Sequence, residues 1–265
     1  MSVRAALTSL PGVNISEFRG VRCLHFETPW IQGAMRIDSP DELHLDYIQR
    51  MMVWMLFRDE AEITSGHAVQ LGLGAAAITR FCHKRLKMRT TAVELNRHVI
   101  DACRVWFRLP RDSARLRVLE MDAAAYVADA AHRGSVDVLS VDLYDEEAAG
   151  PVLDSADFYA GCRALLAAGG LMTVNLFGRD ASFEQSFARI VKAFGADQVH
   201  ALKPTPEGNT IVLAMKQVTV PGRDLLARRA ENIETRWKLP ARKWLRMMSL
   251  FPAETLSSLP ELPPA

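Results

Sequence analysis

The spacing of apolar residues along the chain changes between two periods. Short apolar runs predict strands at residues 68–73, 90–95, 116–121, 136–143, 170–177, 199–202 and 210–215. Between these runs apolar residues recur at helical spacing, which predicts helices at residues 76–86, 97–107, 123–131, 157–167 and 183–194. Apolar strands that alternate with amphipathic helices are typical of a mainly parallel sheet covered on both faces.

The final pair of predicted strands departs from this alternation. They are joined only by the segment Lys203-Pro204-Thr205-Pro206-Glu207-Gly208-Asn209, which is too short to hold a helix. A connection of this length produces an antiparallel pair, which we expect at one edge of the sheet. Seven strands ending in such a pair predict an α/β fold of the class I S-adenosylmethionine-methyltransferase type, which is Rossmann-like.

Two smaller segments flank this predicted domain, which spans residues 41–217. Residues 1–40 contain two short apolar stretches, 17–27 and 30–37, and we expect a small β-hairpin unit there. The sequence Asp38-Ser39-Pro40 then predicts a helix start, followed by helical spacing over residues 41–57. Residues 218–265 form a basic tail with a proline-rich end. In the tail Leu226, Ala230, Ile233 and Trp237 form a helical stripe that we expect to dock on its own domain or at a dimer seam.

Composition and charge indicate a globular protein and give no sign of a metal, nucleic-acid or membrane partner. Of the 265 residues 49% are hydrophobic and 24% are charged, which suffices for a sizeable core. The net charge of +1 gives no electrostatic reason to expect a nucleic-acid partner. No apolar stretch is long enough for a membrane span or a secretory signal, and neither the cysteines nor the histidines have the spacing of a metal site. We therefore expect a cytoplasmic protein with no metal, no nucleic acid and no membrane partner.

A candidate nucleoside site follows the first strand of the main domain. Gly72-Leu73-Gly74 permits a tight turn and a close approach of a ligand to the backbone. Glu94 ends the next strand, 20 residues after Gly74, where a carboxylate can accept hydrogen bonds from both ribose hydroxyls. Residues 72–77 also match the nicotinamide-binding pattern G-x-G-x-x-A. The preceding helix, the antiparallel sheet edge and further acids after the next strands count against a nicotinamide cofactor.

Acids also end the two strands that follow. Asp122 ends the third predicted strand and Asp142 the fourth, so three consecutive strands bring a carboxylate to one edge of the sheet. Ligands bind at this edge in open α/β sheets. Taken singly, each acid is equally well explained as a helix N-cap or a turn residue. Their joint recurrence favours a ligand site.

Together these motifs resemble those of the spermidine synthases (polyamine aminopropyltransferases) over residues 33–215. Gly72-Leu73-Gly74 is similar to the start of the family's glycine loop and Val93-Glu94-Leu95 to its ribose motif. Asp122-Ala123 is similar to its adenine-contacting pair, and Asp142-Leu143-Tyr144-Asp145 has the spacing of its Asp-x-x-Asp signature. The chain looks like a divergent bacterial member of this family.

The resemblance implies a transferase of polyamine biosynthesis that uses decarboxylated S-adenosylmethionine as co-substrate and a di- or polyamine as acceptor. The donor-binding residues that it implies are Gly72, Gly74, Glu94, Asp122, Ala123 and Asp142. Asp142 and Asp145 are the implied catalytic pair, in which Asp142 takes up the proton of the amine and Asp145 holds the amine substrate. Asp46 and Tyr47 fall at the substrate gate. A homodimer is our expectation for the assembly.

Three departures from the family pattern leave alternatives open. Ala75-Ala76-Ala77 stands where the family has Asp-Gly-Gly, and Pro204-Thr205-Pro206 stands where it has Pro-Thr-Tyr. The gate tyrosine is displaced within Leu45-Asp46-Tyr47. The first alternative is a class I methyltransferase that uses S-adenosylmethionine itself. The second is a weakly catalytic scaffold protein that keeps only the nucleoside site.

Overall fold

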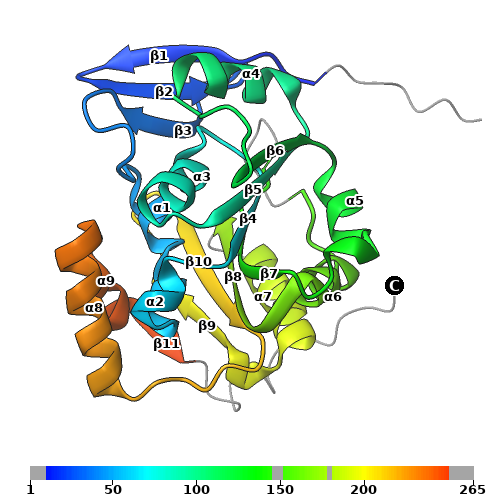
Figure 1. Cartoon of the computed structure of the whole chain (residues 1–265). Coiled ribbons are helices and arrows are strands. Elements are labelled where there is room, and N and C mark those ends of the chain that lie inside the picture. Colours follow the sequence, from blue (N-terminus) through cyan, green and yellow to red (C-terminus); the bar gives the residue numbers. More distant parts are fainter. Residues whose placement is uncertain (1–9, 145–151, 178–180, 251–265) are drawn as a thin grey trace, which may run out of the picture.

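The computed structural model describes residues 10–144, 152–177 and 181–250 and contains two sheets (Figure 1). The smaller sheet lies at the N-terminus and has the antiparallel order β1-β2-β3. Its strands are β1 (Asn14–Phe18), β2 (Val21–His25) and β3 (Ile31–Arg36). The larger sheet has the order β11-β9-β10-β8-β7-β4-β5-β6.

In the larger sheet, the strands from β6 to β8 are parallel, and β10 is antiparallel to both β8 and β9. This topology confirms the predicted fold class and the antiparallel pair. An eighth strand, β11, comes from the tail and pairs with β9, which corrects the expected count of seven. The strand β11 has only three residues, which are too few to show the alternation of apolar and polar positions that predicts a strand. The strands are β4 (His67–Leu71), β5 (Arg89–Glu94), β6 (Leu116–Glu120), β7 (Val136–Val141), β8 (Leu166–Phe177), β9 (Val199–Leu202), β10 (Asn209–Met215) and β11 (Met248–Leu250).

Helices cover both faces of the larger sheet. Successive residues of a strand point to opposite faces, so in β4 Ala68 packs into one core cluster and Val69 into the other. The Ala68 face is covered by α1 (Asp46–Arg50), the 3-10 turn η1 (Val53–Phe57), α2 (Glu60–Ile63), α3 (Ala77–Arg80), α8 (Arg223–Trp237) and α9 (Ala241–Met247). The Val69 face is covered by α5 (Ala123–Ala128), α6 (Ala156–Leu165) and α7 (Ala181–Phe194). A third cluster joins α4 (Arg97–Trp106) to the small sheet.

Short polar side chains cap the N-termini of three helices, each of which follows a strand or a loop. Asn96 accepts a hydrogen bond from the backbone N–H of His98 at the start of α4, and Asp122 accepts one from Ala124 at the start of α5. Ser155 does the same at the start of α6. Each bond satisfies a backbone donor that the first helical turn leaves free. Two of these caps, Asn96 and Asp122, lie at the edge of the sheet where the candidate site is expected.

The N-terminal unit has three strands, where the sequence predicts two. The stretch 17–27 folds back on itself because Arg19 and Gly20 both adopt positive φ, 48° and 77°, which closes a tight turn between β1 and β2. A non-glycine residue rarely adopts this conformation, so the sequence gives little sign of the turn.

The predicted helix start at Asp38-Ser39-Pro40 is also wrong. The Asp38 carboxylate does not cap a helix, because it pairs with the guanidinium of Arg36 at 2.6 Å. The chain then turns, and the helix begins only at Asp46. It ends at Arg50 and is followed by the 3-10 turn η1.

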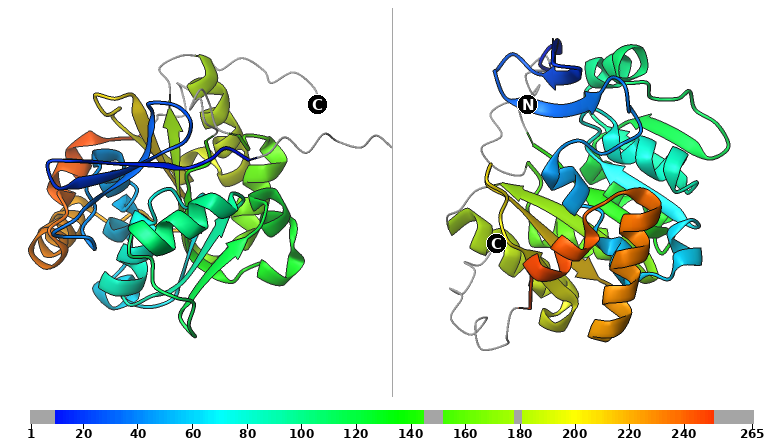
Figure 2. Two further views of the ribbon diagram at one scale, coloured as in Figure 1. Left: turned by 90° about the horizontal axis from the view of Figure 1, so that it is seen from above. Right: turned by 90° about the vertical axis from the view of Figure 1, so that its left-hand side faces the viewer.

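The tail packs on the domain through the apolar stripe that its sequence predicts. Leu226, Ala230, Ile233 and Trp237 are buried in the same cluster as η1, and Figure 2 shows α8 and α9 together on one side of the molecule. Arg229 donates to the carbonyl of Leu56, which ties α8 to that turn. In the described part of the chain no helix has the length and apolar character to cross a membrane.

Candidate active site

A cavity of about 900 Å³ lies at the carboxyl edge of the parallel strands. It is bounded by the segments that follow β4, β5, β6 and β7, by the end of β8, and by residues of the small sheet. The described residues that the sequence predicts for the site all line it: Gly72, Gly74, Glu94, Asp122, Ala123, Asp142, Asp46 and Tyr47. Asp145 lies outside the described residues, so its place in the site stays a prediction.

The loop after β4 has a backbone that needs glycine. Gly72 has a φ of +83°, and a Cβ there would lie 2.0 Å from the backbone oxygen of Asp142. Gly74 also has a positive φ, of +50°. The loop is pressed against β3, since a Cβ on Gly33 would lie 2.5 Å from the backbone nitrogen of Ala75. These close approaches leave backbone, and no side chain, facing the cavity at Gly72 and Gly74.

Glu94 joins this loop to the start of α4. Its Oε2 accepts the backbone N–H of Leu73 and its Oε1 accepts that of Asn96, each at 2.8 Å. Burial raises the pKa of Glu94, and the backbone hydrogen bonds partly oppose that rise. Each carboxylate oxygen has a second lone pair, so both can accept a further hydrogen bond from a ligand in the cavity.

Asp122 has the capping role that its sequence position allows and also lines the cavity. Its Oδ1 accepts the backbone N–H of Ala124 at 2.7 Å. The residue is exposed and lines the cavity. Leu95, Val99 and Met121 add apolar side chains to the lining of the same cavity. An apolar lining together with a carboxylate suits an aromatic base that carries an amino group.

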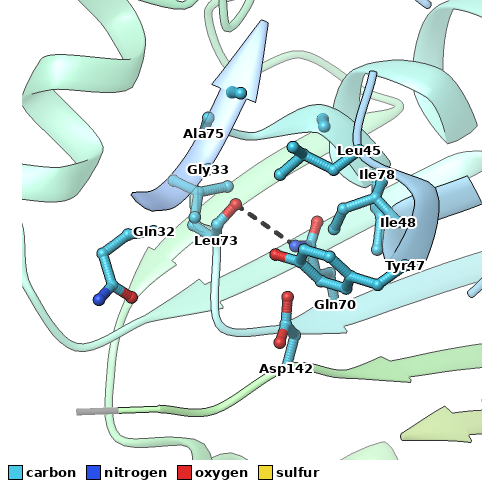
Figure 3. A pocket seen from close by; sticks show the side chains of 13 residues that line it. Gln32, Gly33, Leu45, Tyr47, Ile48, Gln70, Leu73, Ala75, Ile78 and Asp142 are labelled. Atoms are coloured by element: carbon cyan, nitrogen blue, oxygen red, sulfur yellow. Dashed lines mark hydrogen bonds between the residues drawn. The ribbon is translucent and has the colours of Figure 1, made fainter. Parts of the chain in front are cut away.

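Asp142 follows the last residue of β7 and is the most enclosed of the three acids. Its Oδ1 accepts a hydrogen bond from Nδ2 of Asn175 at 2.9 Å. Burial raises the pKa of Asp142, while hydrogen bonds from Asn175 and Tyr47 lower it. Tyr47 and Asp142 line the same small recess of the cavity (Figure 3). Burial and the neighbouring Asp142 carboxylate raise the pKa of Tyr47 well above its ordinary value, so the phenol is a hydrogen-bond donor.

Two buried polar residues that the sequence analysis missed hold the glycine loop. Nε2 of Gln70 donates to the carbonyl oxygens of Gly72, at 2.6 Å, and Leu73, at 3.3 Å. The bond to Leu73 is the dashed line in Figure 3. Arg80 is only 1% exposed and donates to the carbonyls of Pro40, Ala75 and Phe107. Burial lowers the pKa of Arg80 to about 10. A glutamine inside an apolar strand is the signal that could have found Gln70.

The remaining wall comes from segments far apart in the sequence. Trp30, which is 57% exposed, contributes from the connection just before β3. Asp46 contributes from α1 and pairs with Arg50 at 2.6 Å. Glu207 contributes from the turn between β9 and β10, and Asn209 from the first position of β10. Among the described residues Glu207 has no ion-pair or hydrogen-bond partner, so it adds an unpaired carboxylate to the cavity.

Comparisons with known proteins identify the family and the fold of the chain. The family model of the spermine/spermidine synthase domain matches residues 74–208. The chain is 31% identical to a polyamine aminopropyltransferase of Chromobacterium violaceum over 239 residues, which cover 89% of each chain. Its fold is similar to that of a probable spermidine synthase from Corynebacterium glutamicum, with a TM-score of 0.70, 16% identity and coverage of 93% and 91%. It is also similar to human methyltransferase-like protein 13 in complex with SAH, with a TM-score of 0.63, 20% identity and coverage of 74% and 93%.

Proposed function

This chain belongs to the spermine/spermidine synthase family, and we propose that it transfers an aminopropyl group from decarboxylated S-adenosylmethionine to a small di- or polyamine. The product is methylthioadenosine. The observation that carries the proposal is the convergence of Glu94, Asp122 and Asp142, from three consecutive strands, on one cavity. It joins a nucleoside-binding arrangement to a buried carboxylate within the same enclosure.

The donor side of the cavity suits a nucleoside. The backbone at Gly72 and Gly74 leaves room for close contact, since a Cβ at Gly72 would strike the chain itself. Glu94 has two oxygens with free lone pairs, which match the two hydroxyls of a ribose. Asp122 stands beyond the apolar wall, where it can accept a hydrogen bond from the exocyclic amine of adenine. Every one of these groups is held by the chain before a ligand arrives, which reduces the ordering that binding requires.

The acceptor side supports proton removal from an amine. A polyamine enters as an ammonium ion and must lose a proton before its nitrogen can attack. The Asp142 carboxylate, which Asn175 holds by a hydrogen bond to Oδ1, accepts this proton. The amine nitrogen then bonds to the methylene carbon next to the sulfonium. The carbon–sulfur bond breaks, and its electron pair neutralises sulfur in the leaving methylthioadenosine.

Formation of methylthioadenosine from the decarboxylated donor, measured across a panel of diamines and polyamines, tests this function. We expect turnover with at least one amine and its loss in Asp142→Asn. A wild-type protein that binds methylthioadenosine but forms none with any amine would overturn the proposal.

One observation favours the methyltransferase alternative. Ala75 stands where the family has an aspartate that contacts the aminopropyl amine, so the chain lacks one group that would select the decarboxylated donor. Thermal-shift titration separates the two functions, because an aminopropyltransferase is stabilised more by decarboxylated S-adenosylmethionine and a methyltransferase more by the carboxylated form.

We expect this transferase to act in the cytoplasm, since its four cysteines are all free and a reducing compartment keeps thiols in that state. The homodimer remains a prediction, for which light scattering of the purified chain is the direct measurement.

A further inference from the structure

Asp142 lies at the end of a chain of side-chain hydrogen bonds that crosses three neighbouring strands. Nδ2 of Asn175 donates to Oδ1 of Asp142 at 2.9 Å, and Nδ2 of Asn209 donates to Oδ1 of Asn175 at 3.1 Å. The hydroxyl of Thr205 donates to Oδ1 of Asn209 at 3.5 Å, and the same hydroxyl accepts the backbone N–H of Asn209 at 3.2 Å. We call Thr205, Asn209, Asn175 and Asp142 the amide relay.

The direction of the bonds in the amide relay follows from its carboxylate end and is supported by Asn209. An ionised carboxylate only accepts, so the NH2 group of Asn175 faces Asp142, and the oxygen of Asn175 accepts from Asn209. At the far end the Thr205 hydroxyl, whose oxygen also accepts a backbone N–H, donates to the oxygen of Asn209. Neither amide can rotate by half a turn without placing two donors or two acceptors face to face.

Burial and backbone hydrogen bonds hold the side chains of the amide relay in place. Thr205 is 2% exposed and Asn175 is 4% exposed, so water competes little for their hydrogen bonds. Asn175 lies within β8, which is hydrogen-bonded to β10, and the pair Asn209–Phe177 closes that ladder. The backbone oxygen of Asn175 is also fixed, because it accepts the hydroxyl of Tyr144 at 2.9 Å.

We propose that Asn209 is a positioning residue for the reaction: through Asn175, it keeps a hydrogen-bond donor on Oδ1 of Asp142 and so fixes the orientation of the carboxylate that accepts the proton. This inference rests on the proposed function, because it assigns the state of the same carboxylate. Asn175 touches Asp142 directly, whereas Asn209 acts only by fixing which end of the Asn175 amide faces that carboxylate. The hydrogen bond from Asn175 is also one of the two that lower the pKa of Asp142 against the effect of burial.

Other groups that face Asp142 do not replace the amide relay. Tyr47, from α1, donates a second hydrogen bond. Tyr144 is committed to the backbone, since its hydroxyl also accepts the N–H of Phe177 at 2.6 Å. The loop after β4 presents only backbone at Gly72 and Gly74. The remaining charged residues that line the cavity in the described part of the chain are all acids: Asp46, Glu94, Asp122 and Glu207.

The substitution Asn209→Asp tests the amide relay, because a carboxylate at this position only accepts. It would turn Asn175 so that the NH2 group points to residue 209 and the oxygen faces Asp142. Loss of a hydrogen bond to an ionised group corresponds to about one to two pKa units. We therefore expect the acidic limb of the kcat/KM profile to move upward by about one to two pH units. Asn209→Ala removes the support of the Asn175 oxygen without adding a competing acceptor, so its limb should also move upward, but by less than that of Asn209→Asp.

A double-mutant cycle separates the amide relay from the added negative charge. In an Asn175→Ala background the connection is broken, and Asn209→Asp should shift the limb by less than half as much as it does alone. An equal shift in both backgrounds, or an unmoved limb in Asn209→Asp, would overturn the proposal. Circular dichroism and thermal unfolding confirm that the variants are folded.

A second readout needs no turnover. In protein labelled with ¹³C at aspartate carboxyl carbons, the Asp142 signal is the one that disappears in Asp142→Asn. Its titration should show the same upward shift in Asn209→Asp and a smaller upward shift in Asn209→Ala. If the wild-type protein forms no methylthioadenosine, the proposed function fails while this titration still decides on the amide relay.

Discussion

Glu94→Gln is the sharpest test of the nucleoside site, because it preserves the shape of the side chain and removes its charge. In the structure both carboxylate oxygens accept a backbone N–H, from Leu73 and Asn96, at 2.8 Å. A glutamine can accept only one of these, since its NH2 group would face the other N–H. The variant should therefore bind the ribose less tightly and hold the glycine loop less firmly.

The magnitude follows from the kind of bond that is lost. A hydrogen bond to an ionised group contributes about 1.5–3 kcal/mol. Loss of one ribose bond should therefore raise the Kd of methylthioadenosine by roughly 10- to 150-fold. The lost loop contact should lower the Tm by about 2–4 °C for each kcal/mol in a chain of this size. Because burial raises the pKa of Glu94, the wild-type Kd should also rise as the pH falls through that raised value, and this dependence should vanish in the variant.

Isothermal titration of methylthioadenosine is the assay, with Glu120→Gln as the matched control. Glu120 occupies the position on β6 that pairs with Glu94 on β5, but it is exposed and pairs with Arg97. We expect the control to bind like wild type. A folded Glu94→Gln variant with the wild-type Kd would refute the role of Glu94 in ribose binding. A lower Tm with an unchanged Kd would reduce Glu94 to an anchor of the loop.

Three further variants have distinct expected results. Asp142→Asn should slow methylthioadenosine formation by roughly 10²–10⁴-fold. The same variant should raise the Tm at pH 8 but not at pH 3, as measured by calorimetry. Burial raises the pKa of Asp142, so the ionised carboxylate destabilises the fold at pH 8, whereas at pH 3 the carboxyl is protonated and as neutral as the amide. Gly72→Ala should destabilise far more than Gly134→Ala in thermal unfolding, because the first Cβ meets backbone at 2.0 Å and the second, at a φ of +65°, meets nothing within 4 Å. Trp244→Ala should lower the free energy of unfolding in urea by about 3–5 kcal/mol, against about 0.5 for the exposed Lys243→Ala, and equal effects would contradict the packing of the tail.

The sequence predicted that the acids Glu94, Asp122 and Asp142 lie at one edge of the sheet because sheet topology fixes where strands end. Once β4, β5, β6 and β7 are recognised as parallel, Glu94, Asp122 and Asp142 must share one edge. No knowledge of side-chain contacts is needed for that step. The fold class followed from the same alternation of strands and helices.

The features that were missed depend on neighbours that are distant in sequence. Asn175 reaches Asp142 only because β8 pairs with β7, and Asn209 reaches Asn175 only because β10 pairs with β8. The turn at Arg19 depends on a backbone conformation that its side chain does not signal. Asp38 is a residue type that often caps helices, but its carboxylate forms an ion pair with the nearby Arg36. In each case a tertiary or local partner overrides the pattern.

The carboxylates of the cavity also show why the structural and the functional explanation of an acid need not compete. Glu94 holds the glycine loop and Asp122 caps α5, yet each keeps oxygen lone pairs that face the cavity. An acid that is already fixed by backbone N–H groups needs no reorganisation when a ligand arrives, which is the condition for effective electrostatic binding. In the proposed site, the backbone bond that makes such an acid resemble an ordinary cap would therefore also prepare it to bind. Variants at these positions have to be judged on affinity and stability together, since either measurement alone would assign the residue to only one of its two roles.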